Sequence, residues 1–318
     1  MKMHQHPIAS LAVTTLAFCA FSAQAQTSIQ LQNYSVSANV TLDVLGGMGL
    51  EASAVTYARD RGSLFFVGDE GLGVVEISRT GQTLGTMAFD WAGTGSSNND
   101  AEGLTYLGNG VLVVVDERPQ TAYRFGFASG ATLALNSQPK VAITGNATSV
   151  GNVGTEGISY DPRDGRFWSV KQDTPMELRV ASLNFAVGGG TASSTTLFSG
   201  ASSLFGVDSF SDLQVLAGVD ALAGSAAADN LLLLSLDSKR LVEVNRSGQV
   251  LSTLDLAGIT AQAIEGVTID ERGVIYLVAE DSGTGASRLI TLTSPVPEPG
   301  AWLLMALGLP LLVLKRRR

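Results

Sequence analysis

Cysteine and histidine are almost absent from this sequence. The single cysteine, Cys19, and the two histidines, His4 and His6, all lie within the first 25 residues, which we interpret below as a signal peptide. The exported chain would then contain neither thiol nor imidazole. Catalytic Ser-His-Asp and Cys-His arrangements cannot be built without these groups. Zinc, copper and haem sites that depend on them are excluded as well.

Charged and aromatic residues are also scarce, at 15% and 7% of 318 residues, whereas 36 residues are glycine and 45% are hydrophobic. This composition is typical of a globular chain with many short strands and tight turns. Removal of the basic residues at the two ends lowers Lys and Arg from 20 to 15, against 29 Asp and Glu, so the net charge becomes about −14. An acidic surface argues against nucleic acid as a partner and favours cations.

The N-terminal segment has the features of a signal peptide over residues 1–25. Lys2 supplies the positive charge, Ile8–Phe21 the apolar stretch, and Ala23-Gln24-Ala25 an A-x-A cleavage site. We therefore expect export through the Sec machinery and cleavage by signal peptidase after Ala25. An uncleaved membrane anchor and a lipoprotein modified at Cys19 are the alternatives.

The C-terminal segment, residues 295–318, has three parts. Pro297-Glu298-Pro299 precedes the apolar stretch Ala301–Leu314, and Lys315–Arg318 is entirely basic. The basic end is expected to stay in the cytoplasm. The segment resembles the PEP-CTERM sorting signal of Gram-negative bacteria. That resemblance implies an inner-membrane tether, processing by an exosortase near Pro297, Glu298 and Pro299, and delivery to the cell surface or an exopolysaccharide matrix. An ordinary C-terminal anchor is the alternative.

Between the two ends, one pattern recurs. Ala101–Tyr106 reads as a strand, Gly108–Gly110 as a turn, and Val111–Val115 as a buried strand followed by Asp116-Glu117. Similar units start at steps of 51, 54, 56 and 53 residues. Their first acids are Glu51, Glu102, Glu156, Asp212 and Glu265. Repeats of about fifty residues indicate a repeat architecture.

The repeats predict an all-β propeller domain over residues 26–294. Each of the first four offers four strands, whereas the last offers three, so we expect the segment before Glu51 to supply the missing strand and close the ring. Strands are expected over Ser28–Gln32 and Val40–Val44. We predict five blades, with six as the alternative. A row of helical repeats is not favoured, because no stretch has a sustained helical period.

If the first strand of each blade lines the channel, the five repeated acids surround one mouth of it. Glu117 and Glu280, which end second strands, would lie on the same rim. A ring of like charges needs a cation, a hydrogen-bond network or raised pKa values. With oxygen ligands alone, Ca²⁺ suits the site better than Mg²⁺. The alternative is a structural role, in which each acid caps backbone N–H groups of a neighbouring blade.

The same motifs resemble the SdiA-regulated (YjiK-like) β-propeller family over about residues 40 to 292. The resemblance is carried by the three Glu-Gly pairs at 102–103, 156–157 and 265–266, by Asp116-Glu117-Arg118 and by Ile275–Glu280. It implies an exported, calcium-binding propeller of poorly defined activity. The chain departs from the family at Lys171-Gln172, where Lys-Glu is usual, and at Ala279–Ser282, where Ser-Glu-Pro-Asn is usual.

Three functions are compatible with this sequence. We expect an exported, monomeric binding or scaffold module that holds Ca²⁺ and contacts exopolysaccharide or other surface components, and we name no catalytic residue. A metal-dependent phytase-like or esterase-like hydrolase is the alternative, because carboxylates alone can hold a catalytic metal. A lactonase-like enzyme is a third. Phosphate chemistry needs clustered basic residues, and only Arg118 and Lys171 are expected near the mouth, as ligand-binding candidates.

Overall fold

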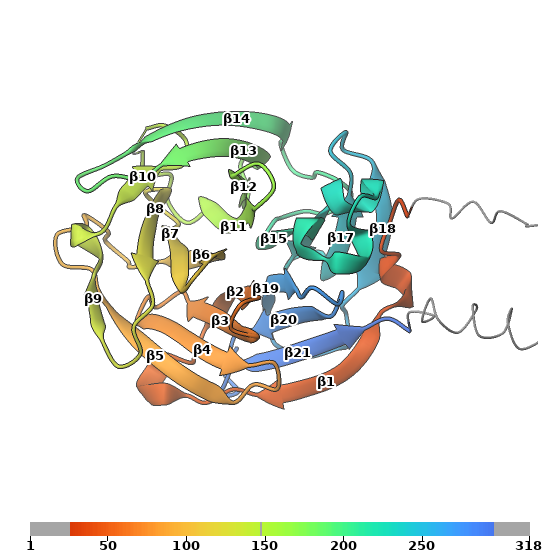
Figure 1. The fold of residues 1–318 in the computed structure, drawn as a ribbon, viewed down its shortest axis with the longest axis horizontal. Coiled ribbons are helices and arrows are strands. Elements are labelled where there is room, and N and C mark those ends of the chain that lie inside the picture. Colours follow the sequence, from red (N-terminus) through yellow and green to blue (C-terminus); the bar gives the residue numbers. More distant parts are fainter. Residues whose placement is uncertain (1–25, 147, 296–318) are drawn as a thin grey trace, which may run out of the picture.

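The computed structural model describes residues 26–146 and 148–295, which form a ring of five β-sheets around a central channel (Figure 1). Each sheet is one blade of a β-propeller. The predicted fold is confirmed, with five blades and not six. The signal peptide and the sorting signal, including Ala25, Pro297, Glu298 and Pro299, lie outside the described residues.

Each blade has an innermost strand beside the channel and three or four further strands outside it. The first three blades contain these strands: β2 (Ala52–Ala58), β3 (Ser63–Gly68), β4 (Gly73–Ser78), β5 (Thr83–Asp90) and β9 (Thr132–Ala134) in blade 1; β6 (Ala101–Gly108), β7 (Val111–Asp116), β8 (Thr121–Gly126) and β10 (Lys140–Ala142) in blade 2; β11 (Thr155–Asp161), β12 (Arg166–Lys171), β13 (Met176–Asn184) and β14 (Thr191–Gly200) in blade 3. Blade 1 is wider than predicted, because β9 leaves blade 2 and pairs with β5 in parallel.

The last two blades share the N-terminal segment. They contain these strands: β15 (Asp212–Val215), β16 (Leu231–Ser235), β17 (Arg240–Val244) and β18 (Val250–Asp255) in blade 4; β19 (Ile264–Ile269), β20 (Ile275–Ala279), β21 (Arg288–Thr293) and β1 (Ser35–Thr41) in blade 5. The other elements are short 3₁₀ helices: η1 (Leu31–Asn33), η2 (Leu45–Gly47), η3 (Leu135–Ser137), η4 (Leu216–Gly218), η5 (Asp220–Leu222) and η6 (Ala226–Asp229). None of the helices in the described part of the chain could cross a membrane.

The ring is closed by β1, which pairs antiparallel with β21 from Ser35 opposite Thr293 to Thr41 opposite Arg288. The expected closure by an N-terminal strand is confirmed. Of the two strands expected before Glu51, Val40–Val44 overlaps β1 only at Val40 and Thr41, and Ser28–Gln32 is not a strand. Its backbone is instead bonded to a buried acid, since the amide of Ile29 donates to Glu243 at 3.1 Å and Leu31 begins η1.

The hydrophobic core is divided into five clusters, each between two neighbouring blades. The second strand of each blade contributes to the centre of this core, and every residue of β3, β16 and β20 is buried. These strands are apolar on both faces because a blade is covered on both sides. The inner strands contact one another all round the ring, so residues at equivalent places in them meet around the channel.

Candidate functional site

Three inner strands carry a β-bulge at the same place, and each bulge holds a glutamate. The pairing register skips Glu102 between Ala101 and Gly103, and it skips Glu156 and Glu265 in the same way. A bulge leaves one residue outside the ladder and redirects its side chain. In β2 the same place is taken by Ser53. The bulges therefore place three acids and one hydroxyl in equivalent positions around the channel.

The glycine that follows each of these glutamates is required by the neighbouring blade. A Cβ atom on Gly157 would lie 2.7 Å from the Cα of Asp212, and one on Gly266 would lie 2.9 Å from the amide of Val55. Any larger residue would push adjacent inner strands apart. The Glu-Gly pairs thus combine an acid at the channel with close contact between blades.

The three glutamates are close enough to affect one another's ionisation. Burial and then the charge of Glu265 hold the pKa of Glu102 well above its usual range. Burial and then the charge of Glu102 do the same to the pKa of Glu156. Burial, with the charges of Glu280 and Asp69, raises the pKa of Glu265 to about 8. Among the described residues, none of the three forms a salt bridge to Lys or Arg.

Further acids from second strands surround this group. Burial and the neighbouring Glu70 raise the pKa of Asp69 to about 6. Burial raises the pKa of Asp116 to about 7. Asp116 is 1% exposed, and both its carboxylate oxygens are buried without a hydrogen-bond partner among the described residues. Unpartnered buried carboxylate oxygens are costly, and the charges that act on Asp116 are those of Asp100, Glu117 and Arg118 rather than the three glutamates.

Glu51 lies beside a second group of acids. It precedes β2 in a left-handed conformation, with φ of 50°. A hydrogen bond with Glu280, then burial and Asp281, raise the pKa of Glu51 to about 8. Glu280 also acts on Glu265, so it connects Glu51 with the three glutamates of the bulges. The predicted residues Glu51 and Glu280 therefore belong to the same mouth, although Glu51 is not the equivalent of Glu102.

Asp212 does not face these acids. The amide of Val215 donates to Ser159 of the previous blade, as the amide of Tyr160 donates to Thr105, so Val215 and Tyr160 are equivalent. Asp212, three residues before Val215, is therefore equivalent to Gly157. Its carboxylate accepts the amides of Leu213 at 2.7 Å and Val267 at 2.8 Å. Burial raises its pKa. Asp212 therefore joins blade 4 to blade 5.

Glu117 has a similar contact, since its carboxylate accepts the amide of Gly154 from blade 3 at 2.7 Å. Burial also raises the pKa of Glu117. Unlike Asp212, it is near enough to Glu102 and Glu156 to affect their ionisation. Glu117 therefore has both a capping contact and a place in the acidic group.

Among the residues that the structure describes, neither predicted basic residue forms a salt bridge to this group, although the charges of Arg118 and Lys171 each interact with that of Glu117. The guanidinium of Arg118 pairs with Asp100 and donates to Asn152 at 2.6 Å. The ammonium of Lys171 is bonded to the carbonyls of Asp173 and Pro175, and burial lowers its pKa. Lys171 is thus held within its own loop, whereas Arg118 is held by residues of two other loops.

We name the group formed by Glu102, Glu156, Glu265, Asp69, Glu117, Glu51 and Glu280 the acidic mouth. Its oxygen donors are of the kind that Ca²⁺ prefers. Within residues 26–146 and 148–295, no three acids are placed to hold a metal ion together. Ca²⁺ also accepts water and backbone carbonyls as ligands, so a pair of carboxylates from the acidic mouth fits such an ion in chemical type.

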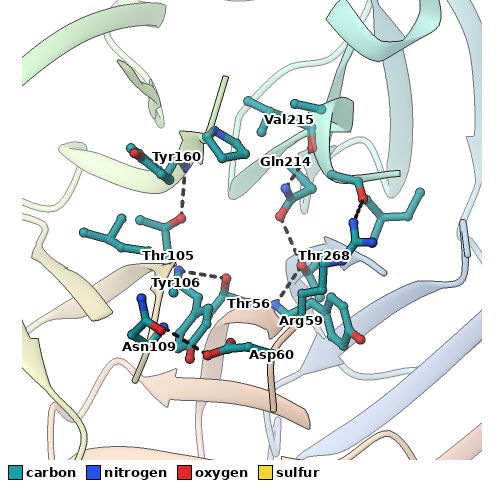
Figure 2. A pocket seen from close by; sticks show the side chains of 17 residues that line it. Thr56, Arg59, Asp60, Thr105, Tyr106, Asn109, Tyr160, Gln214, Val215 and Thr268 are labelled. Atoms are coloured by element: carbon teal, nitrogen blue, oxygen red, sulfur yellow. Dashed lines mark hydrogen bonds between the residues drawn. The ribbon is translucent and has the colours of Figure 1, made fainter. Parts of the chain in front are cut away.

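The opposite ends of the inner strands carry a feature that the sequence analysis missed. Hydroxyl or amide side chains there form hydrogen bonds from blade to blade around the channel (Figure 2). The bonds run from Tyr106 N to Thr56 Oγ1 at 3.1 Å, from Tyr160 N to Thr105 Oγ1 at 3.0 Å, from Val215 N to Ser159 Oγ at 3.1 Å, from Thr268 Oγ1 to Gln214 Oε1 at 3.0 Å, and from Tyr57 N to Thr268 Oγ1 at 3.1 Å. The signal was the Thr-Tyr or Ser-Tyr pair that follows each acid in the first three repeats.

The fold and the bulged inner strands define a five-bladed β-propeller with an acidic channel mouth. A family model described as SdiA-regulated matches residues 26–282. The chain belongs to the SdiA-regulated family, as its Glu-Gly motifs suggested.

Solved structures share the fold only distantly. The Cps50 (Swd1) β-propeller domain of Myceliophteria thermophila is 10% identical, with 78% of this chain and 66% of that chain covered and a TM-score of 0.36. Virginiamycin B lyase from Staphylococcus aureus is 12% identical, with 76% and 66% covered and a TM-score of 0.39. A luciferin-regenerating enzyme is 9% identical, with 81% and 96% covered and a TM-score of 0.45. The chain thus spans just under two thirds of the length of the first two, and we draw no functional argument from these likenesses.

Proposed function

We propose that this protein is an exported binding module whose acidic mouth takes up a hard cation, Ca²⁺. The observation that carries the proposal is that Glu102, Glu156 and Glu265, from three separate blades, occupy equivalent bulges around the channel without a salt bridge to any described basic residue. Carboxylates held together in this way repel one another, and a cation relieves that repulsion. The fold keeps the three acids in place through bulges and glycine contacts, which favours a ligand site over chance clustering.

The binding role is favoured over hydrolysis for two reasons. Residues 26–295 contain no histidine or cysteine, so a hydrolase would depend entirely on metal and carboxylates. Arg118 and Lys171, the basic residues that would neutralise a phosphate, are occupied by Asp100 and by backbone carbonyls. No comparable observation supports a phytase-like, esterase-like or lactonase-like activity.

The place of action is proposed from the two ends of the sequence. The A-x-A site at Ala25 supports export, and the three-part tail from Pro297 supports processing by an exosortase and display at the cell surface or in an exopolysaccharide matrix. A propeller presents both channel mouths to its surroundings, so it suits a displayed binding module. Both ends lie outside the described residues, so this part of the proposal is supported by sequence alone.

Thermal unfolding in a Ca²⁺ titration tests the proposal. A ligand that binds only the folded state stabilises it by mass action, so Ca²⁺ at a hundred times its Kd should raise the Tm by roughly 5–10 °C. EDTA should reverse the shift. Mg²⁺ should act more weakly, because it demands a stricter ligand geometry.

Two variants locate the effect. Glu102→Gln removes a charge at the acidic mouth and should abolish most of the shift. Asp60→Asn removes a charge at the other mouth and should leave the shift unchanged, because Asp60 lies after the opposite end of β2. The proposal is wrong if neither Ca²⁺ nor EDTA changes the Tm of the unmodified protein.

A further inference from the structure

A cavity of about 620 Å³ opens at the mouth opposite the acids (Figure 2). It is lined by the last residues of the inner strands, which bring Tyr57, Tyr106 and Tyr160 together from three blades. A cavity of this size is typical of small-molecule sites. It belongs to neither the acidic mouth nor the sorting signals.

The three tyrosine rings are held in place by packing on one side. Tyr106 stacks on Phe65 with ring centroids 5.8 Å apart and an angle of 15°. Tyr160 packs on Phe167 at 5.1 Å, and the guanidinium of Arg79 lies 4.9 Å from the ring of Tyr57. Each tyrosine also lines the cavity. The cavity wall is therefore formed by aromatic surface that is already fixed in orientation, which lowers the entropy lost on binding.

The floor of the cavity is polar and buried. Thr56, Thr105 and Thr268 also line it, and they are 5%, 4% and 1% exposed. The oxygens of Thr56 and Thr105 accept backbone amides, and no described residue accepts a hydrogen from either hydroxyl. These two hydroxyl groups can therefore donate into the cavity. The hydroxyl of Tyr160 also has no hydrogen bond among the described residues.

The lining is close to electrically neutral. Its only charged residues are Arg59 and Asp60. Arg59 pairs with Asp220 at 2.8 Å, and Asp60 accepts the amide of Asn109 at 3.0 Å. Because a charged ligand in such a cavity would lose hydration without gaining an opposite charge, the lining favours an uncharged ligand.

We propose that this cavity binds a neutral polyhydroxylated ligand, a short saccharide. A sugar ring has an apolar face of C–H groups that suits the negative face of an aromatic ring, and it has hydroxyls that suit the donors of Thr56, Thr105 and Tyr160. The fixed aromatic wall and the buried polar floor provide both kinds of contact in one cavity. The proposal is independent of the cation proposal, because the two sites lie at opposite ends of the inner strands.

Saturation-transfer NMR on the full-length protein in mild detergent tests this binding. The probes are the neutral trisaccharides maltotriose, cellotriose and triacetylchitotriose, with the charged trigalacturonic acid for comparison. We expect saturation transfer to at least one neutral probe and little to trigalacturonic acid. Loss of the aromatic wall in Tyr160→Ala should weaken binding by about tenfold or more.

A cavity-filling variant keeps the test decisive if Tyr160→Ala unfolds. Gly218 lines the cavity, its φ is not positive, and a Cβ placed on it meets no atom within 4 Å. Gly218→Trp should therefore fold and abolish saturation transfer. Tyr34→Phe, which removes a tyrosine hydroxyl that donates to Gly273 outside the cavity, should change nothing. The proposal is overturned if no neutral probe binds, if only trigalacturonic acid binds, or if Gly218→Trp binds as well as the unmodified protein.

Discussion

At the scale of single residues, acids that look alike in the sequence have different surroundings. Glu102, Glu156 and Glu265 occupy bulges at equivalent places in three inner strands. Asp212 lies one position later in its strand and accepts two buried amides instead. The difference comes from the residue that follows, because glycine allows the bulge to approach the next blade. In blade 4 the chain has Asp212 where the three inner strands with a glutamate in the bulge have glycine.

The raised pKa values predict how stability changes with pH in the absence of a cation. Glu265 and Glu51 have folded pKa values of about 8, above those of an unfolded chain, so the folded state binds more protons than the unfolded state between about pH 5 and about pH 8. Their contribution is present at the acid end of this range and is lost as the pH rises. The free energy of unfolding in EDTA should therefore fall from pH 5 to pH 8.

Chemical denaturation at several pH values measures this dependence. Glu265→Gln should flatten it, because one of the groups that binds the extra protons is gone. Asp237→Asn, a change at an exposed acid at the end of β16, should leave it unaltered. A free energy of unfolding that is constant or increases between pH 5 and pH 8 would contradict the assigned environment of these acids.

At the scale of elements, the sequence predicted most strands because each blade alternates short apolar runs with turns. It misplaced the N-terminal strand, since the strand expected over Ser28–Gln32 is a segment bonded to Glu243. No pattern in the sequence near Glu243 indicates that it contacts a segment 214 residues away. Two of the five repeated acids are not in a bulge, because Glu51 lies two residues before the bulge residue Ser53 and Asp212 lies one position after the place equivalent to the bulge. Local spacing could not show which residue of an inner strand would bulge.

The contacts of Glu243 predict that this residue fastens the N-terminal segment. Its carboxylate accepts hydrogen bonds from the hydroxyl of Ser28 at 2.6 Å, the side-chain amide of Asn230 at 2.7 Å and the hydroxyl of Ser252 at 2.7 Å. The side chain is fully buried. Glu243→Ala would leave these donors without a partner, at a cost of about 3 kcal/mol or more in the free energy of unfolding.

Chemical denaturation of Glu243→Ala and of Asp164→Ala compares a fully buried acid with an exposed one. Asp164 pairs with the guanidinium of Arg166 at 2.6 Å, and the two side chains are 36% and 47% exposed, so its removal should cost about 1 kcal/mol or less. Equal losses for the two variants would show that Glu243 is not the anchor of the N-terminal segment.

At the scale of the whole molecule, the propeller has two chemically distinct mouths. The mouth where the inner strands begin gathers acids from several blades. The mouth where they end gathers tyrosines and hydroxyls (Figure 2). Both follow from the repeat, because three inner strands hold a glutamate in a bulge near their start and three carry a tyrosine near their end. The ring thus turns a pattern that is weak in each repeat into two sites that no single blade could form.

Isothermal titration calorimetry of the purified full-length protein with Ca²⁺, at neutral pH after removal of metals with EDTA, measures cation binding at the acidic mouth itself. We predict saturable binding of Ca²⁺ that is weakened at least about tenfold in both Glu102→Gln and Glu156→Gln and is retained in Asp60→Asn. The absence of binding heat for the unmodified protein, or equal affinity in all four proteins, would contradict the proposed role of the acidic mouth.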